Sequence, residues 1–450
     1  MIRLPRPGKG VVRWLAVGLV IREAFSFWTG HPFDFEIWLR NAYWVARGGS
    51  PYTLMPPVPG VSFAYLNQSL TSVAYLPLWS LLLAALYRVY ALVPGGNRFV
   101  LYFLLKQPPI LGDVLLGALL FLAAVRWGAS RAVARRLLAF WMVFPYPILI
   151  AAVWGMFDSL VACLILGALL AAGAWKRSGL LGLGILLKLL PVIFLPYGIV
   201  RARGRGRWAV ALAIAVPAAF TAAVFAVTGW GIAGILATMS WESHVAPQGL
   251  TPAAVLTYPA FAGFFFANPT WIYLLGYAWV PGVLAGGWWA ARRFEAEGPR
   301  DALQAFTFLT VVLFLLRWQV NEQYLIYLLP LLLLDVALWH PERRSLFHAT
   351  WILGSAFLVL NNFFLVRFTA PVNPGALPFE FALAANPAFA SVRLVGLLVL
   401  GILFWVHLLQ MALVLASPRR NPTPWLAGLA LRAWSASRGW LRSVAEGRGG

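Results

Sequence analysis

Charged residues, and carboxylates above all, are scarce in this 450-residue chain. Only 11% of the residues are charged and 14 are Asp or Glu, whereas a soluble domain carries about 25% charged residues. The single cysteine, Cys163, lies in an apolar run, which excludes a disulfide framework and a cysteine-based zinc site. Because 61% of the residues are hydrophobic, the chain is neither a water-soluble globule nor disordered.

Apolar runs make up most of the sequence, and a membrane span needs roughly 20 such residues. The runs cover residues 11–29, 72–93, 99–124, 137–153, 156–174, 179–200, 208–228, 268–291, 302–318, 323–339, 346–366 and 392–416. We therefore predict an all-α polytopic membrane protein with about 10–13 transmembrane helices. The lower count applies if residues 72–93 do not cross and residues 179–200 fold back as a hairpin broken at Pro191.

The basic residues set the predicted topology. Lys and Arg number 35, which gives a net charge of +21, and in a membrane protein such an excess marks cytoplasmic loops rather than nucleic-acid binding. The run at 11–29 is interpreted as an uncleaved anchor, because Arg22 and Glu23 interrupt it and no cleavage site follows. Both termini are then cytoplasmic, and the outer loops are 30–98, 229–267 and 367–391.

Two domains follow from this topology. Residues 1–416 form the transmembrane domain, and residues 417–450 form a basic amphipathic tail that is expected to rest on anionic membrane lipid. No internal repeat is visible, which disfavours an inverted-repeat transporter.

The first outer loop carries two acids among aromatic residues, in the sequence His-Pro-Phe-Asp-Phe-Glu-Ile-Trp. The alternating residues that follow predict a helix in the membrane interface. A carboxylate partly shielded from water is a better base, so Asp34 and Glu36 are candidate site residues. The alternatives are an ion pair with Arg40 or Arg47, and a loose metal site that includes His31. We favour a site without metal.

Four charged residues interrupt apolar runs further along the chain. Lys106 and Asp113 are seven residues apart on one helix face, so each needs a partner on another helix, whether functional or structural. Asp158 stands at a turn between two runs, where it acts in the site or caps the next helix. Lys188 precedes the Pro191 break, where it either reaches an anion or snorkels.

Two further polar segments interrupt the apolar sequence. His244 in the second outer loop binds phosphate when protonated, or is simply solvated. The segment Arg-Trp-Gln-Val-Asn-Glu-Gln-Tyr, which ends with Gln323 and Tyr324, is more polar than a plain turn requires. The alternative is that Asn321 only caps the next helix.

One outer carboxylate and several cations suit the transfer of a sugar from a lipid phosphate. The carboxylate removes a proton from the acceptor hydroxyl, and cations stabilise the departing phosphate. Attack by one base inverts the anomeric centre, and no cofactor is needed.

Five segments in order resemble the GT-C-type mannosyltransferases, most nearly the GPI mannosyltransferase 1 family and its prokaryotic relatives that use polyprenyl-phosphate mannose. They are residues 34–52, 106–113, 154–160, 182–191 and 320–324. The resemblance implies an inverting GT-C fold with Asp34 as the catalytic aspartate. Pro32 replaces the first acid of the family's Asp-x-Asp pair.

The resemblance also implies the remaining roles. Glu36, Asp113 and Asp158 support the site or bind the acceptor. The donor's lipid phosphate contacts Lys106, Lys188, His244, Gln323 and Tyr324. The expected partners are a polyprenyl-phosphate sugar and a lipid-linked or glycan acceptor, with a possible partner subunit and no nucleic acid, on the outer face of the plasma membrane.

Two other functional classes fit the same composition. A transporter or lipid flippase would explain the spans and the intramembrane charges, and would move labelled lipid without forming a glycoside. A non-catalytic subunit of a glycosylation complex would be inactive until its partner is co-expressed.

Overall fold

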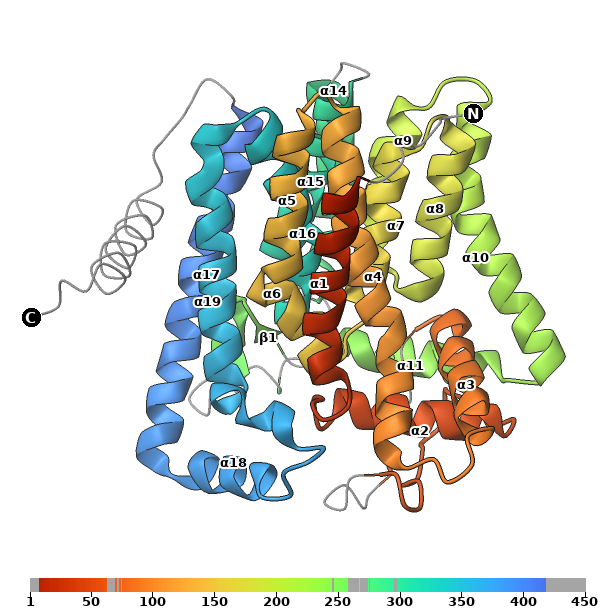
Figure 1. Ribbon diagram of the computed structural model, residues 1–450. Helices are drawn as coiled ribbons and strands as arrows, with labels where there is room; N and C mark the ends of the chain where they lie inside the picture. Colours follow the sequence, from red (N-terminus) through yellow and green to blue (C-terminus); the bar gives the residue numbers. More distant parts are fainter. Residues whose placement is uncertain are drawn as a thin grey trace, which may run out of the picture.

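The computed structural model describes residues 8–62, 69–70, 73, 75–244, 247–257, 267, 274, 276–294 and 298–417, without the side chains of 239–244. Within these ranges the fold is a helical bundle with smaller elements gathered at one end, the lower end in Figure 1. We call this end the Asp34 end and the opposite end, which carries the arginine-rich loops, the arginine end. The bundle helices are α1 (Lys9–Ser26), α4 (Arg98–Arg126), α5 (Arg131–Val143), α7 (Asp158–Leu170), α8 (Ala174–Leu187), α10 (Gly206–Thr228), α14 (Trp279–Arg293), α15 (Pro299–Leu316), α16 (Leu325–Leu338), α17 (Arg344–Asn361) and α19 (Pro387–Ala416).

Shorter elements complete the fold. At the Asp34 end lie α2 (Asp34–Ala46), α3 (Pro77–Ala91), α11 (Ile232–His244) and α18 (Ala376–Ala385). Short helices bend or join the long ones: α6 (Pro145–Ile148), η1 (Leu149–Trp154), η2 (Leu190–Phe194), α9 (Leu195–Arg201), η3 (Pro252–Thr257), η4 (Glu322–Tyr324), η5 (Pro341–Arg343) and η6 (Phe363–Thr369). Two short strands, β1 (Gln248–Gly249) and β2 (Gln319–Val320), pair in parallel.

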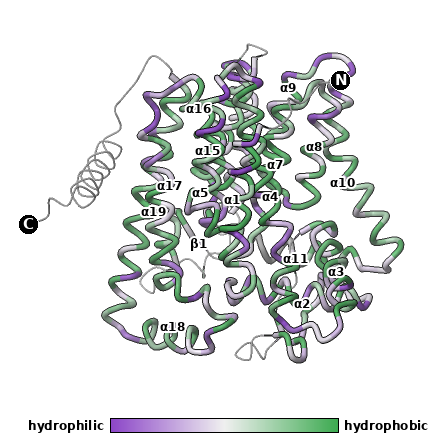
Figure 2. Tube along the Cα trace, in the orientation of Figure 1, coloured by the Kyte–Doolittle hydropathy of each residue, from purple (hydrophilic) through white to green (hydrophobic). Residues whose placement is uncertain are grey.

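Several helices are suited to a bilayer. Of the described helices, α4, α10, α15 and α19 are long and apolar enough to cross, and two bent pairs raise the number to six. Figure 2 shows hydrophobic residues along the length of α10. The predicted all-α polytopic class is confirmed, whereas the total of 10–13 spans and the domain boundary at residue 416 stay predictions. The tail from residue 418 lies outside the described residues.

The hairpin expected within residues 179–200 is confirmed. Helix α8 ends at Leu187, Lys188 is extended (φ −158°, ψ 135°), and the chain continues into η2 and α9. A Cβ on Gly184 would lie 3.0 Å from Pro191 Cγ, so the chain after the break packs back on α8. Residues at the start of α8 and the end of α9 line one cavity, which places both ends of the hairpin at the arginine end (Figure 1).

Helix α2 forms where the interfacial helix is predicted, but its polar residues face the protein. Arg40 and Asn41 are completely buried. Arg40 Nε lies 2.7 Å from Glu36 Oε1, and Arg40 Nη1 donates to the carbonyl of Met55 at 2.9 Å. The ion pair expected as the alternative for these acids is therefore present for Glu36, and it anchors α2 to the loop after it.

A buried ion pair joins the first helix to the bundle. Arg22 and Asp113 are both fully buried, with Arg22 Nε 2.7 Å from Asp113 Oδ2. Trp141 Nε1 and Ser159 Oγ donate to the other oxygen, Oδ1, at 3.1 and 3.2 Å. Arg22 Nη1 also donates to the carbonyl of Met142 at 2.9 Å. One carboxylate thus ties α1, α4, α5 and α7 together.

Replacing Asp113 by Asn will leave the Arg22 charge unpaired and cost about 3–5 kcal/mol of stability. The melting temperature of the detergent-purified protein should fall by several degrees, and the double change Arg22→Met/Asp113→Leu should recover most of the loss. Glu342→Gln, at a half-exposed position of the arginine end, is the control. An unchanged melting temperature for Asp113→Asn would contradict the structural role.

Candidate functional site

Asp34 opens α2 and keeps part of its carboxylate accessible. Its side chain is 28% exposed, whereas that of Glu36 is completely buried. Trp154 Nε1 donates to Asp34 Oδ2 at 2.8 Å. The His31 ring stacks on Trp154 with 5.0 Å between ring centroids, and its Nδ1 lies 3.2 Å from the same carboxylate oxygen. The amide of Asp34 donates to His31 Nδ1 at 3.2 Å. The indole N–H therefore holds the carboxylate, the imidazole lies beside it, and the carboxylate stays partly exposed.

The position of Trp154 follows from an irregular turn. The chain leaves α6 as a π-helix, η1, which ends at Trp154, and Gly155 follows in the left-handed region with φ +93°. The amides of Gly155 and Met156 both donate to the carbonyl of Ile150, at 3.2 and 3.0 Å. A Cβ on Gly155 would lie 3.2 Å from the Phe35 ring. The glycine is required both for this φ and for close packing, and π-turns are frequent at functional sites.

The loop that carries His31 is fixed from two distant parts of the chain. The amide of His31 donates to the carbonyl of Trp154 at 3.2 Å, and the amide of Gly30 donates to the carbonyl of Phe368 at 2.9 Å. Arg367 Nη1 lies 3.5 Å from His31 Nε2, and Arg367 also forms an ion pair with Glu380 of α18. The C-terminal third of the chain thus contributes to the surroundings of Asp34.

Arg367 was not among the residues predicted for the site. It stands on the predicted outer side, where arginine is against the positive-inside rule, a signal that it shares with Arg40 and Arg47. The three residues at φ +48°, +57° and +69° just before it, Phe363 to Leu365, are in a conformation that costs energy for non-glycine residues.

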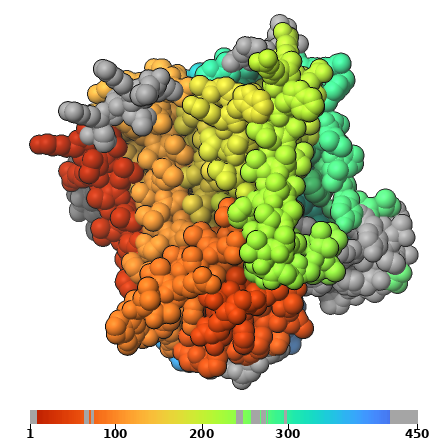
Figure 3. All heavy atoms as spheres, turned by 90° about the vertical axis from the view of Figure 1, so that its right-hand side faces the viewer, coloured from red at the N-terminus to blue at the C-terminus, as the bar shows by residue number. Residues whose placement is uncertain are grey.

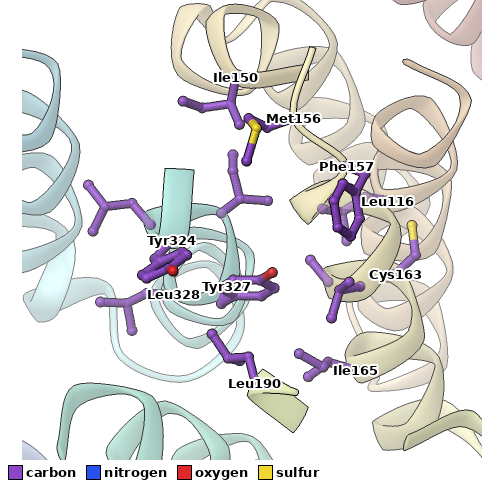
Figure 4. Packing of buried hydrophobic residues seen from close by; sticks show 14 of the residues in the cluster. Leu116, Ile150, Met156, Phe157, Cys163, Ile165, Leu190, Tyr324, Tyr327 and Leu328 are labelled. Atoms are coloured by element: carbon purple, nitrogen blue, oxygen red, sulfur yellow. The ribbon is translucent and has the colours of Figure 1, made fainter. Parts of the chain in front are cut away.

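Lys188 and Asp158 form a second, more deeply buried group. Lys188 Nζ lies 2.7 Å from Asp158 Oδ1, to which the hydroxyl of Tyr327 also donates at 2.6 Å. The other oxygen, Asp158 Oδ2, is buried and has no hydrogen-bond partner among the described residues. Figure 4 shows Tyr324 and Tyr327 projecting from neighbouring turns at the start of α16, with Phe157 across from Tyr327.

Aromatic rings surround the lysine ammonium. Its Nζ lies 4.7 Å from the ring centroid of Tyr324, 5.6 Å from Phe157 and 5.8 Å from Tyr75. The guanidinium of Arg317 lies over the same Tyr324 ring at 5.2 Å. Cations that are held by ring faces and by one carboxylate oxygen still have N–H groups that can donate hydrogen bonds to an anion.

Residues 154–158 connect the two groups. Trp154 binds Asp34, and Phe157 and Asp158 belong to the lysine group. Phe157 also contacts Trp38 of α2, with ring centroids 5.8 Å apart, and stacks on Trp79 of α3 at 4.1 Å. The base candidate Asp34 and the cation candidate Lys188 therefore both contact this five-residue segment.

The two polar segments predicted after residue 240 meet through β1 and β2. The amide of Leu250 donates to the carbonyl of Val320 at 2.7 Å. Gly249 has φ +82°, and a Cβ there would lie 2.2 Å from the Val320 carbonyl oxygen, so only glycine permits this pairing. The pairing secures the segment that precedes Gln323 and Tyr324.

Gln323 is buried, and its Oε1 has no hydrogen-bond partner among the described residues. Burial raises the pKa of its neighbour Glu322, against the effect of a hydrogen bond from Asn361 Nδ2 at 2.8 Å. The turn therefore presents an unpaired amide oxygen and a carboxyl whose charged form is disfavoured.

Lys106 lies at the back of the Asp34 group. Its ammonium donates to the carbonyl and hydroxyl of Thr29 and to the carbonyl of Ala152. These partners lie in the two segments that carry His31 and Trp154. Lys106 and Asp113 have separate partners, as expected from their spacing. Lys106 and its partner Thr29 are both buried. Its predicted contact with a lipid phosphate stays untested.

The metal site considered as an alternative has no counterpart in the described structure, and the prediction for His244 is not tested by it. His31, Asp34 and Glu36 do not converge, since Glu36 is paired with Arg40, and no other group of three His, Cys, Asp or Glu side chains does so in the described part of the chain. The side chain of His244 lies outside the part of the chain that the structure describes.

Burial lowers the pKa of His31 to about 4, and this outweighs the opposite effect of Asp34. The imidazole is therefore uncharged at neutral pH and does not neutralise the Asp34 carboxylate. Because the folded-state pKa lies below the unfolded value near 6.5, the unfolded state takes up the proton first as the pH falls.

We therefore expect His31 to destabilise the fold progressively from about pH 6.5 down to pH 4, by roughly 2 kcal/mol at pH 5. His31→Gln should flatten this part of the pH dependence of the melting temperature. An identical pH dependence in wild type and variant would show that His31 is not buried in this way.

Comparison with known families agrees with the fold. Residues 109–318 match the family model of Glycosyltransferase family 87, which is of the GT-C type. A search of curated proteins finds no match. The matched segment contains Asp113, Asp158 and Lys188, and starts after Asp34. The match indicates a membrane glycosyltransferase, whereas the narrower resemblance to the GPI mannosyltransferase 1 family is not confirmed by it.

Proposed function

We propose that the protein is an inverting glycosyltransferase that moves a mannose or similar hexose from a polyprenyl phosphate to a lipid-linked or glycan acceptor. The observation that carries the proposal is that a partly exposed carboxylate, Asp34, and a ring-enclosed cation, Lys188, both contact the segment 154–158. The family match over residues 109–318 supports the reaction class.

The reaction needs one base and one anion-stabilising group. Asp34 accepts the proton of the acceptor hydroxyl while that oxygen bonds to the anomeric carbon. The bond between this carbon and the phosphate oxygen breaks, and its electron pair leaves with the polyprenyl phosphate. A phosphate is a good leaving group, so no general acid is required, and in-line attack inverts the anomeric centre.

The phosphate side is built from the second group. Lys188 and Arg317, which share the Tyr324 ring, stabilise the charge of the leaving phosphate. Gln323 and His244 are proposed as further contacts to the lipid phosphate of the sugar donor. Asp158 positions Lys188 through its 2.7 Å ion pair.

The remaining predicted residues act in the proposal by holding elements in place. Glu36 fixes α2 through Arg40, Asp113 fixes α1 through Arg22, and Lys106 fixes the segments of Thr29 and Ala152. We place the Asp34 end on the outer face of the plasma membrane, with cytoplasmic termini, in line with the positive-inside rule.

Asp34→Asn tests the base. In proteoliposomes supplied with polyprenyl-phosphate mannose and an acceptor membrane extract, turnover should fall by about 10²–10⁴-fold, while the melting temperature stays within a few degrees. Glu342→Gln removes a carboxylate at the arginine end and should retain full activity. Near-full transfer by Asp34→Asn would refute the assignment, and transbilayer movement of labelled lipid without any glycoside would favour a flippase.

Trp154→Phe tests the positioning of that base. Phenylalanine keeps the stacking on His31 but removes the N–H that donates to Asp34, so kcat should fall about tenfold with little change in KM for the donor. Trp79→Phe is a matched control, because Trp79 Nε1 is buried without a hydrogen-bond partner among the described residues. A change confined to KM would contradict a role for Trp154 in orienting Asp34.

A further inference from the structure

A cavity lies at the arginine end, away from the Asp34 group. Its volume is about 410 Å³, and its walls come from α8, η2, α9, the start of α10 and the start of α15. This volume is within the range of ligand pockets, about 300–1,000 Å³. In Figure 1 these elements meet at the upper end, near α9.

The cavity is positively charged where it opens and apolar inside. Arg177, Arg201 and Arg203 belong to its lining, and Arg177 and Arg203 are exposed. Deeper in the lining, Phe194 and Phe306 are buried, and so is the hydroxyl-bearing Ser178. Among the lining residues that the structure describes there is no carboxylate. Asp301, in the first turn of α15, is not among the lining residues.

The surface around the opening is that of a protein in contact with lipid. Trp208, at the start of α10, is 73% exposed, and Trp175, at the start of α8, is 52% exposed. Ile199 and Ile214 continue this apolar surface at 52% and 55% exposure. Figure 3 shows α10 on the outside of the bundle beside α8. Tryptophan is enriched where a membrane protein crosses the headgroup layer, so the arginines stand at headgroup level.

We propose that this cavity binds the headgroup of an anionic phospholipid. The arginines bind the phosphate, the glycerol lies at the mouth of the cavity on the side of Ser178, and the acyl chains lie along the exposed apolar faces of α9 and α10. Basic pockets between membrane helices are suited to such headgroups, and arginine forms bidentate bonds to phosphate. A free phosphate would satisfy the arginines but leave the apolar lining and the exposed tryptophans unused. The site is at the opposite end from Asp34, so it can be tested without any sugar-transfer assay.

The variant Arg177→Gln/Arg203→Gln tests the proposal. It spares Arg201, which has a further interaction within the protein. Arg177 itself donates from Nε to the carbonyl of Ala168 at 3.3 Å, so the melting temperature without lipid is recorded for both variants. The control is Arg131→Gln/Arg136→Gln, which removes the same charge from exposed positions of α5 at the same end of the bundle. The purified full-length protein is titrated with phosphatidylglycerol, with phosphatidylcholine and with inorganic phosphate, and bound lipid is counted by native mass spectrometry while the melting temperature is recorded.

Phosphatidylglycerol should bind and raise the melting temperature of wild type, as any ligand specific for the folded state does, and phosphatidylcholine should do so far less. The cavity variant should bind phosphatidylglycerol about 25-fold more weakly, since each of the two basic residues near the surface contributes roughly fivefold, and the control should change less than twofold. Equal losses in both variants would show a general charge effect and overturn the site. A full effect from inorganic phosphate alone would overturn the lipid as its occupant. A cavity variant that melts lower without lipid but binds phosphatidylglycerol normally would also overturn the proposal.

Discussion

A charge in an apolar interior has to be compensated by partners inside the protein, and this requirement organises the whole bundle. Arg22 is matched by Asp113, Lys188 by Asp158, and Lys106 by carbonyl oxygens at the ends of two other segments. Each of these contacts joins elements that are distant in the sequence. These charged residues therefore help to fix the neighbours of α1, α4 and α7.

Asp34 is the exception, and in the proposed mechanism it is the base. In the described part of the chain it forms no ion pair with lysine or arginine. Its neighbours are a neutral imidazole and an indole N–H, which orient the carboxylate without cancelling its charge. Its partial exposure leaves room for an acceptor hydroxyl. The segment 154–158, whose Trp154 donates to Asp34, also carries Phe157 and Asp158, which contact Lys188.

Local patterns predicted much of this arrangement. Apolar run lengths gave the helical class, the Pro191 break gave the hairpin, and the spacing of Lys106 and Asp113 required separate partners, which the structure supplies. What could not be predicted depends on long-range packing. Arg22 was interpreted as an interruption of an apolar run, because nothing near it in the sequence reveals Asp113. The contact of Trp154 with Asp34 and the approach of Arg367 to His31 likewise join segments more than 100 residues apart.

The anomeric configuration of the product tests the central claim most directly. A single carboxylate that activates the acceptor permits one displacement at the anomeric carbon, so donor and product must have opposite configurations. NMR of the glycoside formed by the reconstituted wild-type protein, compared with the configuration of the polyprenyl-phosphate donor, measures this. Inversion is the predicted result. Retention would require a covalent sugar intermediate or a second displacement, and would contradict Asp34 as a general base.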